Sequence, residues 1–208
     1  MYLPPHFVES RAETFQRILR EHPLGALVTH ADPQGLDADH LPFEFDPSVG
    51  PHGTLLAHVA RANPVWERFT EGSPVLVIFS GAQGYISPSW YPSKQETHRQ
   101  VPTWNYEVLH AHGTLHIHDD ERWLRGLLAR LTRRHEAGEP TPWRMGEAPS
   151  DYLDAMLRNI VGIEVRITTL VAKSKLSQNR EPRDRLHAAD TLETRGRTAL
   201  ARAMRQVD

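Results

Sequence analysis

Four histidines recur at even positions of one segment, TWNYEVLHAHGTLHIH, which spans residues 103–118; they are His110, His112, His116 and His118. Side chains alternate between the two faces of a strand, so these rings share one face and the apolar odd positions share the other. We expect the apolar face to line the core and the histidine face to lie outside. Imidazole pairs can bind zinc, copper, nickel or haem iron. A histidine-ligated metal or haem site is one interpretation, and a half-polar strand filler is the other.

A second candidate is the segment LAHVARANPVW, where a strand ends and a short helix begins. It carries His58, Arg61 and Asn63, and Asn63 caps the helix with Pro64 at its first position. Free N–H groups at a helix start, beside an arginine, favour a phosphate. The competing interpretation is plain capping with a solvated Arg61.

Two further segments, ISPSWY and VPTWNY, place hydroxyl groups next to Trp90 and Trp104. Such pairs can flank a flat heterocycle by stacking and by hydrogen bonds to its rim. Each tryptophan taken singly is equally explained as a core or interface residue. The segment KLSQNR, residues 175–180, adds many donors directly after a strand in a chain with only three lysines. It indicates an anionic or polar ligand, or else a polar strand exit.

The composition excludes several kinds of chemistry. The chain has no cysteine, so it has no disulfide, no thiolate nucleophile and no thiolate zinc site. It has no GxSxG, GxxxxGK[ST] or GxGxxG motif, and we assign no catalytic residue. Its formal net charge of −2 argues against a broadly cationic nucleic-acid-binding body. Whether the chain is an enzyme is left open at this point.

The N-terminus has no secretory signal, and the longest apolar run, Val75 to Phe79, is far shorter than the ~20 residues that span a bilayer. We therefore expect a cytoplasmic protein with no membrane partner.

The elements that position these residues follow from periodicity and turn signals. Helices are expected over 11–22, from Asn63, from Asp119 as cap, from Ser150 as cap, and weakly over 190–206. Strands are expected over 24–31, 37–46 after a turn at 31–35, 55–60, 74–81, 84–91, 103–118 and 161–176.

Hairpins outnumber helix-linked crossovers in this pattern, which predicts a mostly antiparallel sheet. The fold class is mainly β with peripheral helices (α+β), and a closed or split barrel fits it. The C-terminal end carries seven arginines from Arg180 onward against five acidic residues, and we expect it to be solvated.

Seven strings occur in order between Met1 and about Arg180: MYLPPHF, HLPFEF, AHVARANPVW, YISPSWY, VPTWNY, VGIEV and KLSQNR. Together they resemble the PaiB family, which is grouped as FMN-binding negative transcriptional regulators. The resemblance implies an FMN-binding split β-barrel over residues 1–180, related to the pyridoxamine-phosphate oxidase barrels. Residues 181–208 would form an arginine-rich, partly helical C-terminal tail.

The same resemblance implies a bacterial homodimer with an FMN cleft at each subunit boundary, acting as a transcriptional regulator or flavin-dependent sensor. By analogy with the related barrels, the phosphate would contact His58, Arg61 and Asn63. The flavin ring would face Thr103, Trp104 and Asn105. The cofactor would also be reached from the other subunit by Lys175, Gln178 and Arg180.

Two other functions remain alongside this one. The first is a flavin-dependent oxidoreductase, in which the flavin carries the chemistry and the protein positions it. The second is the histidine-ligated metal or haem protein. For DNA binding, the sequence shows no helix-turn-helix signature and no basic excess. The arginines of residues 180–205, presented by a two-fold dimer, are then the only plausible DNA surface.

Overall fold

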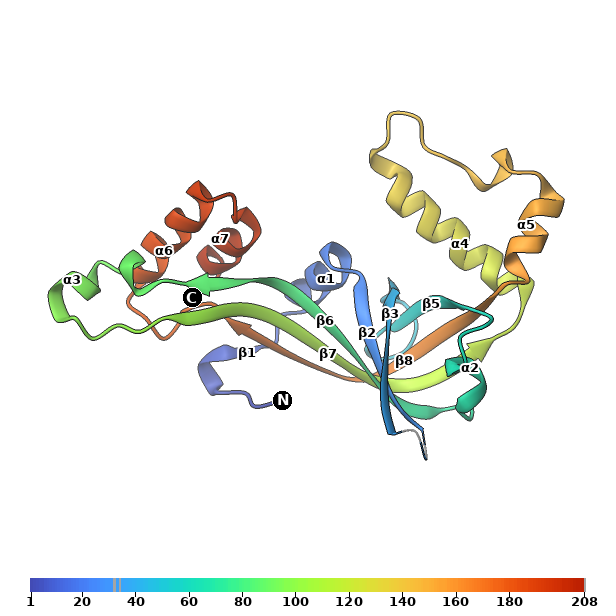
Figure 1. Ribbon diagram of the computed structural model, residues 1–208, viewed down its shortest axis with the longest axis horizontal. Helices are drawn as coiled ribbons and strands as arrows, with labels where there is room; N and C mark the ends of the chain where they lie inside the picture. The colour runs from blue at the N-terminus through green and yellow to red at the C-terminus, as the bar shows by residue number, and fades with distance from the viewer. Residues whose placement is uncertain (32, 34, 208) are drawn as a thin grey trace. The chain divides into compact units, whose positions relative to one another are not determined.

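The computed structural model describes residues 1–31, 33 and 35–207. Two residues of the expected turn at 31–35, Asp32 and Gln34, lie outside the described residues. The chain divides into two compact units: unit 1 comprises residues 1–22, 79–110 and 171–208, and unit 2 comprises residues 23–78 and 111–170. Three long strands, β6 (Ser73–Ile86), β7 (Thr103–His118) and β8 (Ile160–Lys175), contribute residues to both units (Figure 1).

The strands form one sheet in the order β3-β2-β6-β7-β8-β5-β4, with β1 paired to β8. The shorter strands are β1 (Val8–Glu9), β2 (Leu24–Ala31), β3 (Gly35–Pro42), β4 (Glu44–Asp46) and β5 (Thr54–Ala60). The registers of β2 with β3 and β6, of β5 with β4 and β8, and of β1 with β8 are all antiparallel. The expected mostly antiparallel sheet with helices is confirmed, and the sheet is not closed into a barrel.

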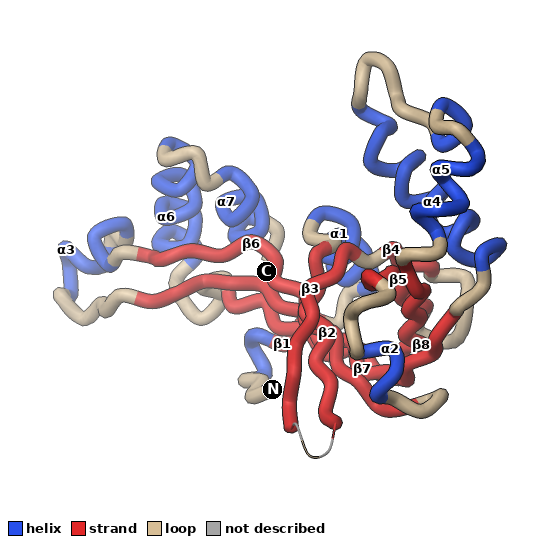
Figure 2. Tube along the Cα trace, turned by 45° about the vertical axis from the view of Figure 1, so that its right-hand side comes forward, coloured by secondary structure: helices blue, strands red, loops and turns tan. Residues whose placement is uncertain are grey.

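Along the chain, helices α1 to α5 lie between strands, and α6 and α7 follow the last strand (Figure 2). The α-helices are α1 (Ala12–Glu21), α2 (Val65–Arg68), α3 (Ser93–Thr97), α4 (Glu121–His135), α5 (Ser150–Leu157), α6 (Pro182–Thr194) and α7 (Thr198–Arg205). Short 3-10 turns occupy Pro5–Phe7, Pro88–Trp90, Glu136–Gly138 and Met145–Glu147. None of these helices combines the length and the low polarity that crossing a bilayer requires.

Unit 2 is held by strand pairing and by α4. The β2–β3 hairpin pairs Leu24 with Pro42, and β5 pairs with β8 from Thr54 opposite Arg166 onward. Buried Leu27, Leu55 and Ile163 supply apolar side chains to the interior of this unit. The apolar face of α4 packs on β5 in a cluster of buried residues, Leu56, Leu127 and Leu131, with Trp123 against it.

Unit 1 contains the C-terminal helices, and here the expectation of a solvated tail is wrong. A cluster of buried residues joins α6 and α7 to β6 and to the segment after β8: Ala82, Ile86, Tyr91, Leu176, Ala188, Ala189, Leu192, Leu200, Ala201, Ala203, Met204 and Val207. Alanine and leucine at helical spacing form a narrow apolar face that the arginines conceal in the composition. Figure 1 shows α6 and α7 beside the part of β6 that belongs to this unit. The division into an FMN-binding domain over residues 1–180 and a tail over residues 181–208 stays a prediction.

Residues 74–81 and 84–91 do not form two separate strands; one strand, β6, runs from Ser73 to Ile86. Gly81 lies inside it because the Glu107 side chain packs over that position, and an added Cβ would lie 2.9 Å from Glu107 Cβ. A glycine in a strand can mark such a close approach instead of a turn.

The expected helix starts also need correction. Asp120, not Asp119, caps α4, because its carboxylate accepts a hydrogen bond from the Trp123 N–H (2.7 Å). Ser150 begins α5 without a side-chain capping bond. In the tail, α6 begins at Pro182, well before the expected residue 190, since proline suits the first turn of a helix.

Candidate functional site

A groove of about 940 Å³ opens on unit 1, and we call it the aromatic groove. Its walls come from the end of β6, the turn that follows, the start of β7 and the α6–α7 connection. They consist of Gln83, Gly84, Tyr85, Ser87, Ser89, Trp90, Trp104, Leu192, Arg195 and Arg197. Tyr85 and Trp104 are each 49% exposed, so large aromatic surface faces the groove without being covered by the core.

The aromatic rings of the groove are oriented by specific contacts. Tyr85 and Trp90 meet edge to face, with centroids 6.5 Å apart and planes at 79°. The Trp104 indole N–H donates to Gln83 Oε1 at 3.3 Å. Aromatic pairs with this geometry attract one another beyond their buried area. The groove therefore presents fixed, flat apolar surfaces.

Two guanidinium groups border the same groove. The Arg195 guanidinium carbon lies 4.9 Å from the Trp90 ring centroid, a cation–π contact. Within the described residues, neither Arg195 nor Arg197 has a carboxylate partner. Three other arginines of the same segment do: Arg183 pairs with Glu96, Arg202 with Glu21, and Arg205 with Asp190 and Glu193. Among the residues that the structure describes, no carboxylate therefore neutralises the positive charge at the groove.

Lys175 fixes the β7 side of the groove. Its ammonium donates to Thr103 Oγ1 (2.7 Å) and to the Trp104 carbonyl oxygen (2.9 Å). Thr103, Trp104 and Lys175, which belonged to two of the predicted groups, are thus brought together within one subunit. Of these three, only Trp104 lines the groove.

The opposite wall is fixed by α6. The buried Asp184 carboxylate accepts hydrogen bonds from the Ser93 N–H (3.0 Å) and the Ser93 hydroxyl (2.5 Å). A ring nitrogen of His187 lies 2.8 Å from the Trp90 carbonyl oxygen. The turn that carries Trp90 is therefore tied to the C-terminal helix.

Asn105 is fully buried and does not line the groove. Its amide donates to Ser177 Oγ (2.9 Å), and the Tyr91 hydroxyl lies 3.3 Å from the same oxygen. Burial raises the pKa of Tyr91. Ser177 has a φ of 70°, in the left-handed region that non-glycine residues rarely adopt. This network holds the turn after β8 in its unusual conformation.

The other two predicted residues of that turn also contact protein. The Gln178 amide donates to the Ser174 carbonyl (2.6 Å) and accepts from the Leu176 N–H (2.7 Å). The Arg180 guanidinium lies 5.7 Å from the centroid of the Tyr91 ring. Both side chains contact residues of this chain and stabilise the turn. That they contact the cofactor of a second subunit stays a prediction.

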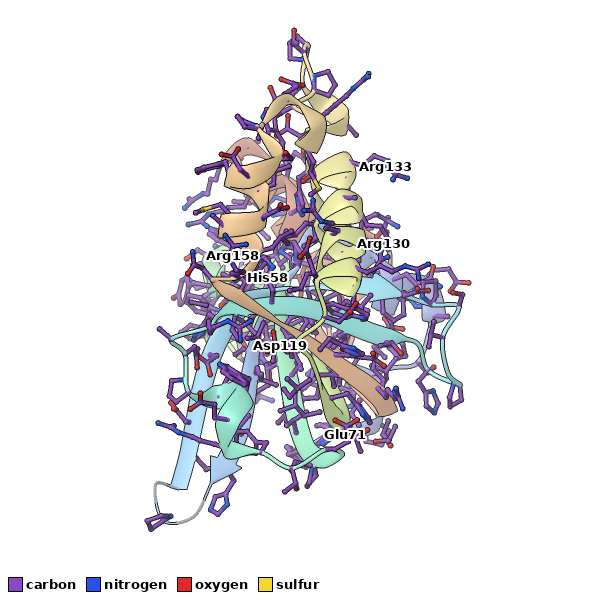
Figure 3. All side chains as sticks on the ribbon, turned by 90° about the vertical axis from the view of Figure 1, so that its right-hand side faces the viewer. His58, Glu71, Asp119, Arg130, Arg133 and Arg158 are labelled. Carbon is purple, nitrogen blue, oxygen red and sulfur yellow. The ribbon has the colours of Figure 1, made fainter. Side chains whose placement is uncertain are left out.

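In unit 2, Arg61 is extensively paired. Its guanidinium binds both carboxylate oxygens of Asp119 (3.0 and 2.5 Å) and also donates to the carbonyls of Arg158 (2.7 Å) and Ile160 (3.2 Å). The hydrogen bond from Arg61 lowers the pKa of Asp119. Figure 3 labels Asp119 at the connection between β7 and α4. The arginine therefore ties the end of β5 to two neighbouring segments.

Asn63 and His58 differ in whether their polar side-chain atoms have hydrogen-bond partners. The expected cap is wrong, because α2 begins at Val65 with Pro64 as its N-cap. The Asn63 side-chain oxygen accepts from the Val65 N–H (2.8 Å), and its side-chain amide donates to Asp39 (2.6 Å). His58, on β5 opposite Gly162, is half-buried, and its Nδ1 is buried with no hydrogen-bond partner. Burial lowers the pKa of His58. An unpaired buried nitrogen of this kind suits a ligand group that is absent from the protein alone.

The histidine-bearing strand behaves differently from expectation on one point. Leu109, Ala111 and Leu115 are buried as predicted, but His116 is buried too and pairs with Glu71. His118 lies 2.5 Å from a carboxylate oxygen of Glu164 and stacks on Trp123, with centroids 4.3 Å apart. Across residues 1–31, 33 and 35–207, no group of three or more histidine or acidic side chains is arranged to hold a metal ion.

The nine predicted residues thus divide between the units: His58, Arg61 and Asn63 lie in unit 2, and the other six lie in unit 1. Sequence reasoning missed Tyr85, Gln83, Arg195 and Arg197. The signal for the last two was the string Arg-Gly-Arg, in which Gly196 adopts a φ of +72° at the turn between two helices. That turn places both arginines at the groove.

The groove suits a flat ring with an anionic tail, since it offers aromatic faces, an amide and two arginines. The mostly antiparallel sheet with its peripheral helices has the fold of the split-barrel class. The chain belongs to the family described as "Putative FMN-binding domain", whose model matches residues 1–169. FMN is therefore the cofactor of the family to which this chain belongs.

Sequence relatives support the same family. The chain is 31% identical over 193 residues to the Protease synthase and sporulation protein PAI 2 of Bacillus subtilis, covering 93% of this chain and 89% of that protein. The protein YKL070W of Saccharomyces cerevisiae is 35% identical over 158 residues, covering 67% of this chain and 93% of its own length. The resemblance to the PaiB family is confirmed, but such relatives are not confined to bacteria.

Solved structures support the fold. An FAD and haem binding protein from Mycobacterium smegmatis superposes with a TM-score of 0.59 at 18% identity, covering 81% of this chain and 73% of that one. A putative 5-nitroimidazole antibiotic resistance protein from Bacteroides thetaiotaomicron gives 0.58 at 14% identity, covering 80% and 85%. The predicted fold class, a flavin-binding split barrel with peripheral helices, is confirmed.

Proposed function

We propose that this protein binds FMN in the aromatic groove and works as a dimeric flavoprotein, either a flavin-dependent sensor that regulates transcription or an oxidoreductase. The observation that carries the proposal is the joint presence, in one groove, of three partly open aromatic side chains and two arginines without carboxylate partners. A bound flavin supplies one- and two-electron redox chemistry, and the protein supplies binding and orientation.

The groove residues divide the task of binding. The Trp104 indole, oriented by Gln83, offers a stacking surface for the ring, and Trp90 and Tyr85 offer a second apolar wall. Arg195 and Arg197 supply the positive charge that a phosphate needs, with N–H groups arranged to donate to its oxygens. Ser87 and Ser89 add hydroxyl groups at the wall.

The His58 region supports the dimeric part of the proposal. Arg61 and Asn63 already use most of their hydrogen-bonding groups within unit 2, so His58 is the member of that predicted group with an unused buried nitrogen. In a dimer, this region of one subunit would complete the site offered by the groove of the other. Homodimerisation and the role of His58 are parts of the proposal.

Flavin titration of the purified chain, followed by flavin fluorescence quenching, tests the proposal. FMN and riboflavin share the ring and differ in the phosphate. Replacing both groove arginines (Arg195→Ala with Arg197→Ala) should weaken FMN about tenfold or more, because charge-assisted hydrogen bonds contribute about 1.5–3 kcal/mol, and should leave riboflavin nearly unchanged. Trp104→Ala should weaken both ligands.

Arg99→Ala is the matched control, since Arg99 is exposed and lies outside the groove. Equal FMN affinity in the double variant and the wild type would remove the groove as the FMN site. A loss of FMN binding in His58→Ala, together with normal binding in the double arginine variant, would instead assign the cofactor to the strand β5 region.

DNA binding through the tail is the alternative for the regulatory role. Its electrostatic support is small, because Arg183, Arg202 and Arg205 are neutralised by carboxylates and Arg185 donates to backbone carbonyls. A gel shift that weakens steeply with salt would favour it.

A further inference from the structure

A second pocket lies in unit 2, outside every residue assigned above, and we call it the α4 pocket. Its volume is about 470 Å³. One wall is the C-terminal half of α4 with the turn that follows it, and the other is the returning segment 142–145. The lining residues are Ala129, Thr132, Arg133, Glu136, Ala137, Pro142, Trp143, Arg144 and Met145.

The returning segment is held in place by hydrogen bonds. The Trp143 N–H donates to Glu136 Oε2 (2.9 Å), which ties the segment to the end of α4. The Arg144 N–H donates to Glu147 Oε1 (2.9 Å), and the Glu147 N–H donates back to the Arg144 carbonyl (2.9 Å). These hydrogen bonds therefore give the pocket wall a defined conformation.

The lining is largely apolar and partly uncovered. Alanine, proline, methionine and tryptophan side chains form most of the surface. Trp143 is 41% exposed, so part of its indole surface is free to contact a ligand. Pockets of a few hundred Å³ with apolar walls and a few polar groups are typical of small-molecule sites.

The charge at the pocket is positive. Arg133 and Arg144 have no carboxylate partner among the described residues, and both lie at the pocket. The single carboxylate there, Glu136, already accepts the Trp143 N–H. Figure 3 shows Arg133 directed outward from α4. Two guanidinium groups against one engaged carboxylate leave an excess of one positive charge.

We propose that the α4 pocket binds a monoanionic small molecule with an apolar or aromatic body, such as an aromatic carboxylate or sulfonate. The apolar walls and the Trp143 indole bind the body, and Arg133 and Arg144 bind the anionic group. Such a ligand matches the net charge and the size of the pocket. The site is independent of the flavin groove, which belongs to unit 1.

The test uses the full chain and two fluorescent probes with the same rings. 8-Anilino-1-naphthalenesulfonate carries the anion, and N-phenyl-1-naphthylamine lacks it. We expect saturable binding of the sulfonate, weakened about tenfold by Arg133→Ala with Arg144→Ala, while the neutral amine binds this variant as it binds the wild type. Trp143→Ala should weaken both probes. Arg122→Ala, an exposed arginine of α4 outside the pocket, is the matched control and should change neither.

Equal affinity for the sulfonate in the double arginine variant and in the wild type overturns the proposal. So does a Trp143→Ala variant that binds both probes normally but changes the oligomeric mass, because the pocket would then cover a second copy of the chain. FMN titration of the same variants should be unchanged, so that failure here is distinguishable from failure of the flavin proposal.

Discussion

Arginine side chains differ in their contacts in this protein, and residue type alone does not separate them. Arg61 is a structural clamp that joins the end of β5 to Asp119 and two backbone carbonyls. Arg195 lies over the Trp90 ring, which leaves its N–H groups available to a ligand. Arg197 has neither kind of partner in the described part of the chain. Of these three, Arg195 and Arg197 are suited to binding an external anion.

Glu164 gives a pH-dependent contribution to stability. Burial raises its pKa, but hydrogen bonds from Arg166 and His118 lower it more, so the net shift is below the ordinary value of 4.5. A carboxyl group with a lowered pKa in the folded state stabilises the fold above the unfolded pKa, and this contribution is lost as the pH falls through the folded pKa.

We therefore expect Glu164→Gln to destabilise the protein near neutral pH and to do so less in acid, as measured by urea unfolding at about pH 7 and about pH 4. Glu67→Gln, at an exposed position of α2, is the control and should cost little at either pH. The same loss of stability for Glu164→Gln at both pH values would contradict the assignment.

At the scale of elements, the C-terminal helices are part of the folded core of unit 1. Leu200 and Met204 on α7 are buried in one cluster with Ile86 of β6 and Leu176. A Cβ on Gly84 would lie 3.0 Å from Leu200 Cδ2, so strand and helix are in close contact. The same helices supply one wall of the aromatic groove. Loss of their packing would therefore also disturb the groove.

Leu200→Ala should lower the free energy of unfolding by about 2–5 kcal/mol, because a buried leucine is replaced by a cavity. Leu186 on α6 is 42% exposed, so Leu186→Ala should change the free energy of unfolding by about 0.5 kcal/mol or less. Thermal or urea unfolding measures both. If the two variants lost equal stability, α7 would not be packed as the structure shows.

At the scale of the whole molecule, unit 1 leaves large apolar side chains uncovered. Tyr85, Val101 and Trp104 are 49%, 63% and 49% exposed. Exposed apolar side chains gathered in one part of a protein often mark an interaction site. A second copy of the chain, which would cover them and complete the flavin site, is the partner that our functional proposal requires.

Light scattering should therefore give twice the chain mass of 23.7 kDa. Val101→Asp should shift the protein toward the monomer, because a charge would have to be buried at the contact, whereas the nearby Arg99→Ala should leave the mass unchanged. A monomeric mass for the wild type at micromolar concentration would refute the dimer.

The sequence by itself determined what depends on neighbouring residues. The β2–β3 hairpin, the alternation of β7, the presence of a short helix after Asn63 and the membership of an FMN-binding family all followed from local patterns or motif order. Period, capping and turn chemistry act over a few residues, so a single sequence displays them.

Only the tertiary structure decided which distant residues meet. Asp119 was expected to cap a helix but binds Arg61, fifty-eight positions away. Gly81 was expected to end a strand but lies within one because Glu107 packs over it. The tail was expected to be solvated but packs an apolar face into the core of unit 1, and its Arg195 lies on Trp90. These contacts depend on which strands and helices become neighbours in the sheet, and no local pattern contains that information.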